Sequence, residues 1–94
     1  MGITKILKYP VKGKGEVTTI TCQRYRLLDI QLQGLELVCW IETRDDYPET
    51  TTELLSIGTG WELPSDVMDR AVYFKTVQDA AGYVWHFYEL GGNS

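Results

Sequence analysis

The sequence predicts an all-β fold, a small antiparallel sandwich or partly open barrel of six or seven strands with at most one short helix. Three observations predict it. Apolar and polar residues alternate with a period of two, turn-forming residues recur about every 8–12 positions, and the segments between them are rich in Thr, Val and aromatic residues. Ninety-four residues suit a single domain, which we place at residues 1–90 with a flexible tail at 91–94.

The strongest element is a hairpin in the middle of the chain. Residues 28–33 alternate strictly, and a second alternating segment, 35–42, follows after the single turn residue Gly34. The alternation leaves open whether Val38 and Trp40 form an exposed apolar stripe or belong to a core covered on both sides. The apolar faces expected for the two strands are Leu28, Ile30 and Leu32, and Leu35, Leu37, Cys39 and Ile41.

Further strands are predicted on both sides of this hairpin, and a second hairpin closes the chain around a turn at 79–82. A short helical turn is expected near Val67, with Ser65 as its N-cap and Pro64 outside it. The remaining predicted strands are 3–9, 16–22, 50–57, 71–77 and 83–90.

The charge balance argues against broad nucleic-acid binding. The net charge is −4 and the pI about 4.8, whereas such binding depends on clustered Lys and Arg. Four lysines do gather between Lys5 and Lys14, so a small anionic ligand near that end stays open beside the alternative of an ordinary solvated surface.

The two cysteines are expected to be free thiols in a reducing cytoplasm. Cys22 and Cys39 lie in β-like surroundings without a CxxC motif. We expect neither a signal peptide nor a membrane span, because no apolar run follows a basic start and none reaches about 18 residues.

The segment Gly58-Thr59-Gly60-Trp61 is the leading candidate for a binding site. Two glycines let a ligand approach the backbone amides, Thr59 offers a hydroxyl, and Trp61 offers a flat face for stacking. The alternative is a strand-ending turn whose Trp fills the core. Tyr47 and Tyr25 are further candidates for stacking, and His86 for a polar contact.

No catalytic motif occurs, so we expect a non-enzymatic protein without cofactor or metal. The single histidine, His86, has no partner at metal-ligand spacing, and a structural role is the favoured interpretation. Asp45 and Asp46 lack the oxygen spacing of a calcium loop.

Four sequence blocks resemble a family of small uncharacterised phage and prophage proteins. Members often carry His after the Gly-Thr-Gly, where this chain has Trp61, so any role of that His is lost or replaced by stacking here. His86 matches the family pattern. The blocks are 6–11 (ILKYPV), 28–40 (with IQLQ and LVCW), 56–60 (SIGTG) and 73–89 (with KTVQ and VWHFYE).

The resemblance implies an accessory protein made in the cytoplasm of an infected bacterium. From it we expect a homo-oligomer that counters host defence by sequestering a nucleotide immune signal. Two alternatives stay open. One is direct inhibition of a host defence nuclease or nucleic-acid complex through an acidic face, and the other is a minor virion protein. The acidic face consists of Glu42, Asp45, Asp46, Glu49 and Glu53.

Overall fold

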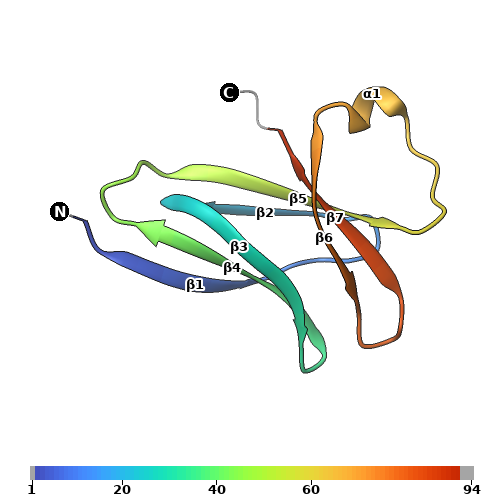
Figure 1. Cartoon of the computed structure of the whole chain (residues 1–94), viewed down its shortest axis with the longest axis horizontal. Helices are drawn as coiled ribbons and strands as arrows, with labels where there is room; N and C mark the ends of the chain where they lie inside the picture. Colours follow the sequence, from blue (N-terminus) through green and yellow to red (C-terminus); the bar gives the residue numbers. More distant parts are fainter. Residues whose placement is uncertain (1, 92–94) are drawn as a thin grey trace.

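The computed structural model describes residues 2–91 and contains seven strands and one short helix (Figure 1). The expected tail lies, from residue 92 on, outside the described residues. In chain order the elements are β1 (Thr4–Pro10), β2 (Val17–Cys22), β3 (Arg24–Gln33), β4 (Glu36–Arg44), β5 (Thr50–Gly58), α1 (Ser65–Met68), β6 (Ala71–Gln78) and β7 (Val84–Leu90).

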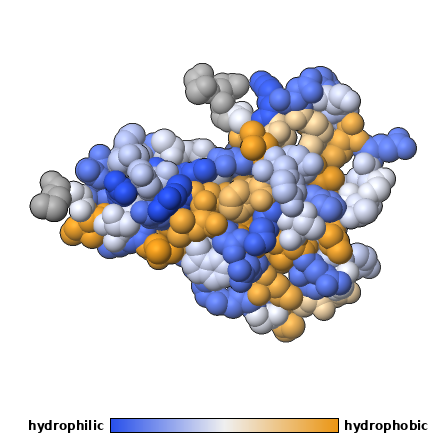
Figure 2. All heavy atoms as spheres, in the orientation of Figure 1, coloured by the Kyte–Doolittle hydropathy of each residue, from blue (hydrophilic) through white to orange (hydrophobic). Residues whose placement is uncertain are grey.

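The strands form two antiparallel sheets, which confirms the predicted fold class. One sheet has the order β1-β4-β3 and the other β2-β5-β7-β6. The molecule is flat, with Cα extents of 46 × 34 × 14 Å, so its core is thin and many apolar side chains reach the surface. Figure 2 shows such apolar patches interrupted by polar residues.

The predicted central hairpin is confirmed as β3–β4, and its turn depends on Gly34, whose φ of 64° favours glycine. Three of the expected facings are wrong, and one of them is Leu32 near the end of β3, which is exposed. A register shift between Leu27 and Asp29 leaves Leu28 exposed and buries Leu27 instead. Leu35 lies in the turn, where its side chain is 89% exposed.

The core forms where the inner faces of the two sheets meet. Phe87 of β7, Leu54 of β5 and Ile41 of β4 are fully buried there. The open question about β4 is answered: Val38 is buried and Trp40 is half-buried, so they form no exposed stripe.

The short helix forms where predicted, but its expected cap is wrong. Ser65 is the first helical residue, and Pro64 occupies the N-cap position without a side-chain capping hydrogen bond. The carbonyl oxygen of Pro64 accepts from the amides of Val67 and Met68, which closes the turn.

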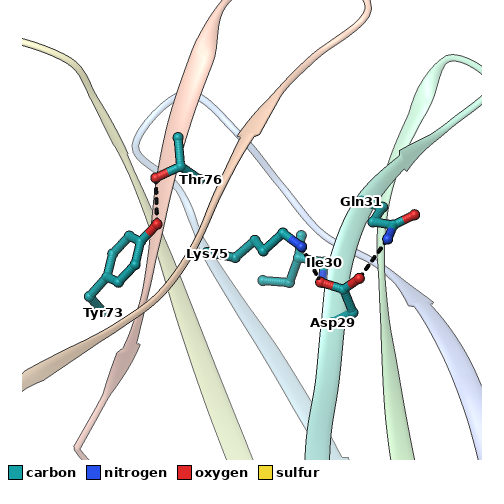
Figure 3. A network of polar contacts seen from close by, with 6 residues as sticks. All are labelled: Asp29, Ile30, Gln31, Tyr73, Lys75 and Thr76. Carbon is teal, nitrogen blue, oxygen red and sulfur yellow. Dashed lines mark hydrogen bonds and ion pairs between the residues drawn. The ribbon is translucent and has the colours of Figure 1, made fainter.

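The two sheets are tied together where β3 faces β6. Lys75 Nζ lies 2.7 Å from Asp29 Oδ1, and Figure 3 shows this contact together with the bond from Gln31 to the same carboxylate. Partial burial raises the pKa of Asp29, but hydrogen bonds from Lys75, Gln31 and the Ile30 amide outweigh it, so the net pKa is lowered. Arg24 of β3 also pairs with Glu89 of β7. This side of the sandwich is therefore closed by ion pairs between side chains.

Both cysteines are free and buried, as predicted. Burial raises the pKa of the Cys39 thiol to about 11, so at neutral pH it behaves as a small apolar side chain.

Candidate functional site

The Gly58–Trp61 segment forms a tight turn in which the Trp61 indole packs against Gly58 and Gly15. The Trp61 amide donates to the Gly58 carbonyl oxygen over 3.2 Å, and Gly60 has a φ of 85°, as a type II turn requires at its third position. A Cβ on Gly58 would lie 2.6 Å from the indole, and one on Gly15 would lie 2.8 Å from it. Both glycines therefore leave the space that the ring occupies.

Trp61 belongs to a cluster of three aromatic rings. Its ring meets that of Trp85 edge to face, with centroids 5.5 Å apart, and Tyr83 lies 6.2 Å from Trp85 on a tilted plane. Trp85 is buried, whereas Trp61 is 48% exposed and Tyr83 is 63% exposed. A fixed central ring thus supports two rings that reach solvent.

Asp79 holds the central ring in place. Its carboxylate accepts from Trp85 Nε1 and from the amides of Ala81 and Tyr83, each over 2.9 Å. The bond from Trp85 is the largest cause that lowers the pKa of Asp79. One carboxylate therefore fixes both the β6–β7 turn and the orientation of Trp85.

The aromatic cluster borders an open groove of about 400 Å³. Among the described residues, those lining it include no carboxylate: Gly58, Thr59, Trp61, Gly82, Tyr83, Val84 and Trp85. An adjoining hollow is lined by Lys14, Tyr83 and Trp85, so a cation stands beside the rings. Lys14 has a φ of 61°, uncommon for a residue other than glycine, in the turn that the Glu16 amide closes on the Gly13 carbonyl. We call the lining of the groove and of the adjoining hollow, with Lys14, the aromatic groove.

Thr59, on the groove wall, begins a chain of polar contacts on the outer face of the second sheet. His86 Nε2 lies 2.7 Å from Thr59 Oγ1, and its Nδ1 lies 2.9 Å from Thr76 Oγ1. Tyr73 extends the chain by a contact of 2.7 Å to Thr76, and Figure 3 shows this last step. Both ring nitrogens of His86 are thus engaged.

The row of hydrogen-bonded side chains that starts at Thr59 is better suited to positioning the Thr59 hydroxyl than to activating it as a nucleophile. In nucleophilic triads a third group, usually a carboxylate, orients the imidazole and stabilises its cation. Here that place is taken by the hydroxyl of Thr76. A neutral His86 can donate from one nitrogen and accept at the other, which satisfies both threonines.

The structure brings five of the six predicted site residues together and leaves Tyr47 apart. Gly58, Thr59, Gly60 and Trp61 share one turn, and His86 bonds to it. Tyr47 precedes β5 whereas Trp61 follows it, and the nine residues of β5 span roughly 27 Å. Figure 1 shows the β4–β5 loop and the end of β5 on opposite sides of the molecule.

Tyr47 instead packs against Tyr25, edge to face, with centroids 5.4 Å apart. The guanidinium of Arg44 lies 3.6 Å above the centre of the Tyr25 ring, and that of Arg26 lies 5.5 Å from it. The face of Tyr25 is therefore already occupied. We call Tyr25, Tyr47 and Arg44 the tyrosine cluster.

The proposed acidic face is smaller than the sequence indicated. Glu42 is buried, and its carboxylate lies 2.6 Å from Arg26 Nε and 3.9 Å from Arg44 Nη2. Asp45 accepts from the Ile3 amide over 2.7 Å. Two of the five acidic residues therefore serve internal contacts.

Sequence reasoning missed the aromatic residues Tyr83 and Trp85 of the groove and the carboxylate of Asp79 that holds Trp85, whereas Lys14 was noted only as one of four lysines near which a small anionic ligand stayed open. Tyr83 and Trp85 stand two apart in the segment predicted as strand 83–90, a spacing that places both side chains on one face of a strand. That signal could have marked an aromatic pair, but it could not show that Trp61 packs against it.

The comparison with known families gives one match, to Domain of unknown function (DUF7352), over residues 3–93. The chain belongs to this family. No curated protein and no solved structure matched the chain. In residues 2–91 no helix has the length and apolarity to cross a membrane, and no three His, Cys, Asp or Glu side chains are placed to hold a metal ion.

Proposed function

We propose that this member of the DUF7352 family is a non-enzymatic binding protein whose aromatic groove takes a planar, anionic ligand of the nucleotide class. The observation that carries the proposal is the pair of exposed rings, Trp61 and Tyr83, both supported by the buried Trp85. Base stacking on such rings contributes about 1–3 kcal/mol per base.

The charges around the groove favour an anion. Lys14 stands beside Tyr83 and Trp85, and no described residue on the groove wall carries a carboxylate. Asp79 lies behind Trp85, and its carboxylate, which stays charged, accepts from Trp85 Nε1 and two amides. Lys14 also borders a second hollow lined by Glu16, Glu36 and Asp79, so we expect a phosphate to contact Lys14 from the side of Tyr83 and Trp85, where no described carboxylate lines the hollow.

The biological role that we propose follows from the resemblance to phage proteins. A groove for nucleotides in such a protein would let it sequester a nucleotide immune signal in the cytoplasm of an infected bacterium and so counter host defence. Sequestration needs affinity and abundance but no turnover. This agrees with the contacts of Thr59 and His86, in which a threonine stands where a nucleophilic triad has a carboxylate.

The experiment is a calorimetric titration of the protein with adenosine, its monophosphate and cyclic dinucleotides of adenine and guanine. We expect the phosphorylated ligands to bind more tightly than the nucleoside, and Lys14→Gln to reduce that difference, with Lys5→Gln as the matched control. Salt should weaken the phosphate contribution because Lys14 is exposed. Equal affinity for nucleoside and nucleotide, or no binding of either, would reject the proposal.

A further inference from the structure

Four strands lie at sheet edges, and three of them carry features that prevent pairing with another chain. Edge strands expose unpaired backbone groups, which proteins usually guard with charges, proline or bulges. β1 carries Lys5, Lys8 and Pro10. β3 and β6 have register shifts and face each other through Asp29 and Lys75.

β2 has none of these guards. Its sequence, VTTITC, contains no charge and no proline, and its register with β5 is unbroken from Val17 to Cys22. On its outer face Thr19 and Thr21 are exposed. It is therefore the one edge, among the described strands, that a further strand can extend without removing a charge or a bulge.

The direction of the free backbone groups follows from the pairing with β5. The Ser56 amide donates to the Glu16 carbonyl oxygen, so the even-numbered residues direct their backbone groups toward β5. Alternation then turns the amides and carbonyls of Val17, Thr19 and Thr21 to the open edge. These three residues are arranged symmetrically about Thr19.

We infer that β2 pairs with β2 of a second copy of this chain, antiparallel about a twofold axis at Thr19. Thr19 then faces Thr19 of the partner subunit, and Val17 faces Thr21 of the partner subunit. Threonine pairs are favourable across strands, and no like charges meet in this register. The result is a continuous eight-stranded sheet across the two copies. The pairing does not depend on ligand binding in the aromatic groove.

The chain exposes a large area for its size, as its flat shape requires. The chain exposes 6164 Å², about 650 Å² more than the roughly 5500 Å² expected of a folded monomer of 10.7 kDa. A standard interface covers about 800 Å² on each partner. The surplus belongs to the whole of a flat molecule, and along β2 it includes the exposed side chains of Val17, Thr19 and Thr21.

The test is the mass of the full chain by sedimentation velocity over a range of concentrations. We expect a species of twice 10.7 kDa. Because Thr19 meets its own copy, Thr19→Lys and Thr19→Glu should each weaken the dimer about tenfold, and an equal mixture of the two should restore it. Thr4→Lys, on the guarded edge β1, is the matched control and should leave the dimer unchanged.

Hydrogen exchange supplies a second readout that needs no substitution. The amides of Val17, Thr19 and Thr21 should become protected as the protein concentration rises. A monomer at every concentration would overturn the inference. So would a dimer that Thr19→Lys and Thr19→Glu leave intact, or one that Thr4→Lys dissociates.

Discussion

The aromatic groove and the tyrosine cluster contain similar residues at opposite ends of β5 but present them differently. At the tyrosine cluster the face of Tyr25 is covered by the guanidinium of Arg44, 3.6 Å from the ring centre. In the aromatic groove Trp61 rests on Gly58 and Gly15 and stays half exposed. The difference is that the rings of the aromatic groove reach solvent, whereas a guanidinium already covers the face of Tyr25.

The largest expected effect is the loss of ligand affinity in Trp61→Ala. Removing one stacking ring should cost about 1–3 kcal/mol of binding free energy, or roughly 5- to 150-fold in Kd. The buried half of the ring also contributes to stability, so urea unfolding should confirm that the variant is folded before it is titrated. Calorimetric titration measures the affinity. Tyr47→Ala is the matched control from the tyrosine cluster, and a similar loss there would contradict the distinction between the two regions.

A smaller effect is expected for Arg44→Ala, and it should lower the stability rather than the ligand affinity. The substitution removes the cation from the Tyr25 ring and one partner from the buried carboxylate of Glu42. We expect a loss of about 1–2 kcal/mol in the free energy of unfolding, measured by urea titration, with unchanged ligand affinity. Lys5→Ala, which removes an exposed cation from β1, serves as the control. Weaker ligand binding in Arg44→Ala would show that the two regions are coupled.

The smallest effect, and the one that depends on pH, is expected for Asp79→Asn. The pKa of Asp79 is lowered in the folded protein, chiefly by the bond from Trp85, so its carboxylate stabilises the fold above the unfolded-state pKa of about 3.9. That stability is lost as the pH falls through the lowered value.

The stability of Asp79→Asn should therefore fall below that of the unsubstituted protein at pH 7, and the gap should narrow below about pH 4. Urea unfolding at pH 7 and pH 3 measures both gaps. Affinity should fall less than in Trp61→Ala, because Asp79 acts only by orienting Trp85. A difference in the free energy of unfolding that is the same at both pH values would show that the charge of the Asp79 carboxylate does not stabilise the fold.

The sequence predicted the strands well because their signals are local. Alternation and Gly34 were enough for the β3–β4 hairpin. Leu28 was misplaced because a bulge adds a residue without changing the composition around it. The cap was misplaced by one residue, because the helix already begins at Ser65 and the preceding Pro64 has no side-chain acceptor for the free amides.

The candidate site was predicted in part for the same reason. The turn from Gly58 to Trp61 is contiguous and could be recognised, whereas its packing against Trp85 joins strands that are distant in the chain. Tyr47 was grouped with Trp61 by residue type alone. The length of the intervening strand, Thr50–Gly58, already separates the two and could have excluded the pairing.

The most direct test of the aromatic groove uses the three tryptophans as probes of one binding event. Indole ¹H–¹⁵N signals from Trp40, Trp61 and Trp85 can be followed while a cyclic dinucleotide is added. We predict large shifts for Trp61 and Trp85 and none for Trp40, which lies half-buried on β4 away from the groove. Shifts at Trp40 alone, or no shift at any indole, would contradict the account.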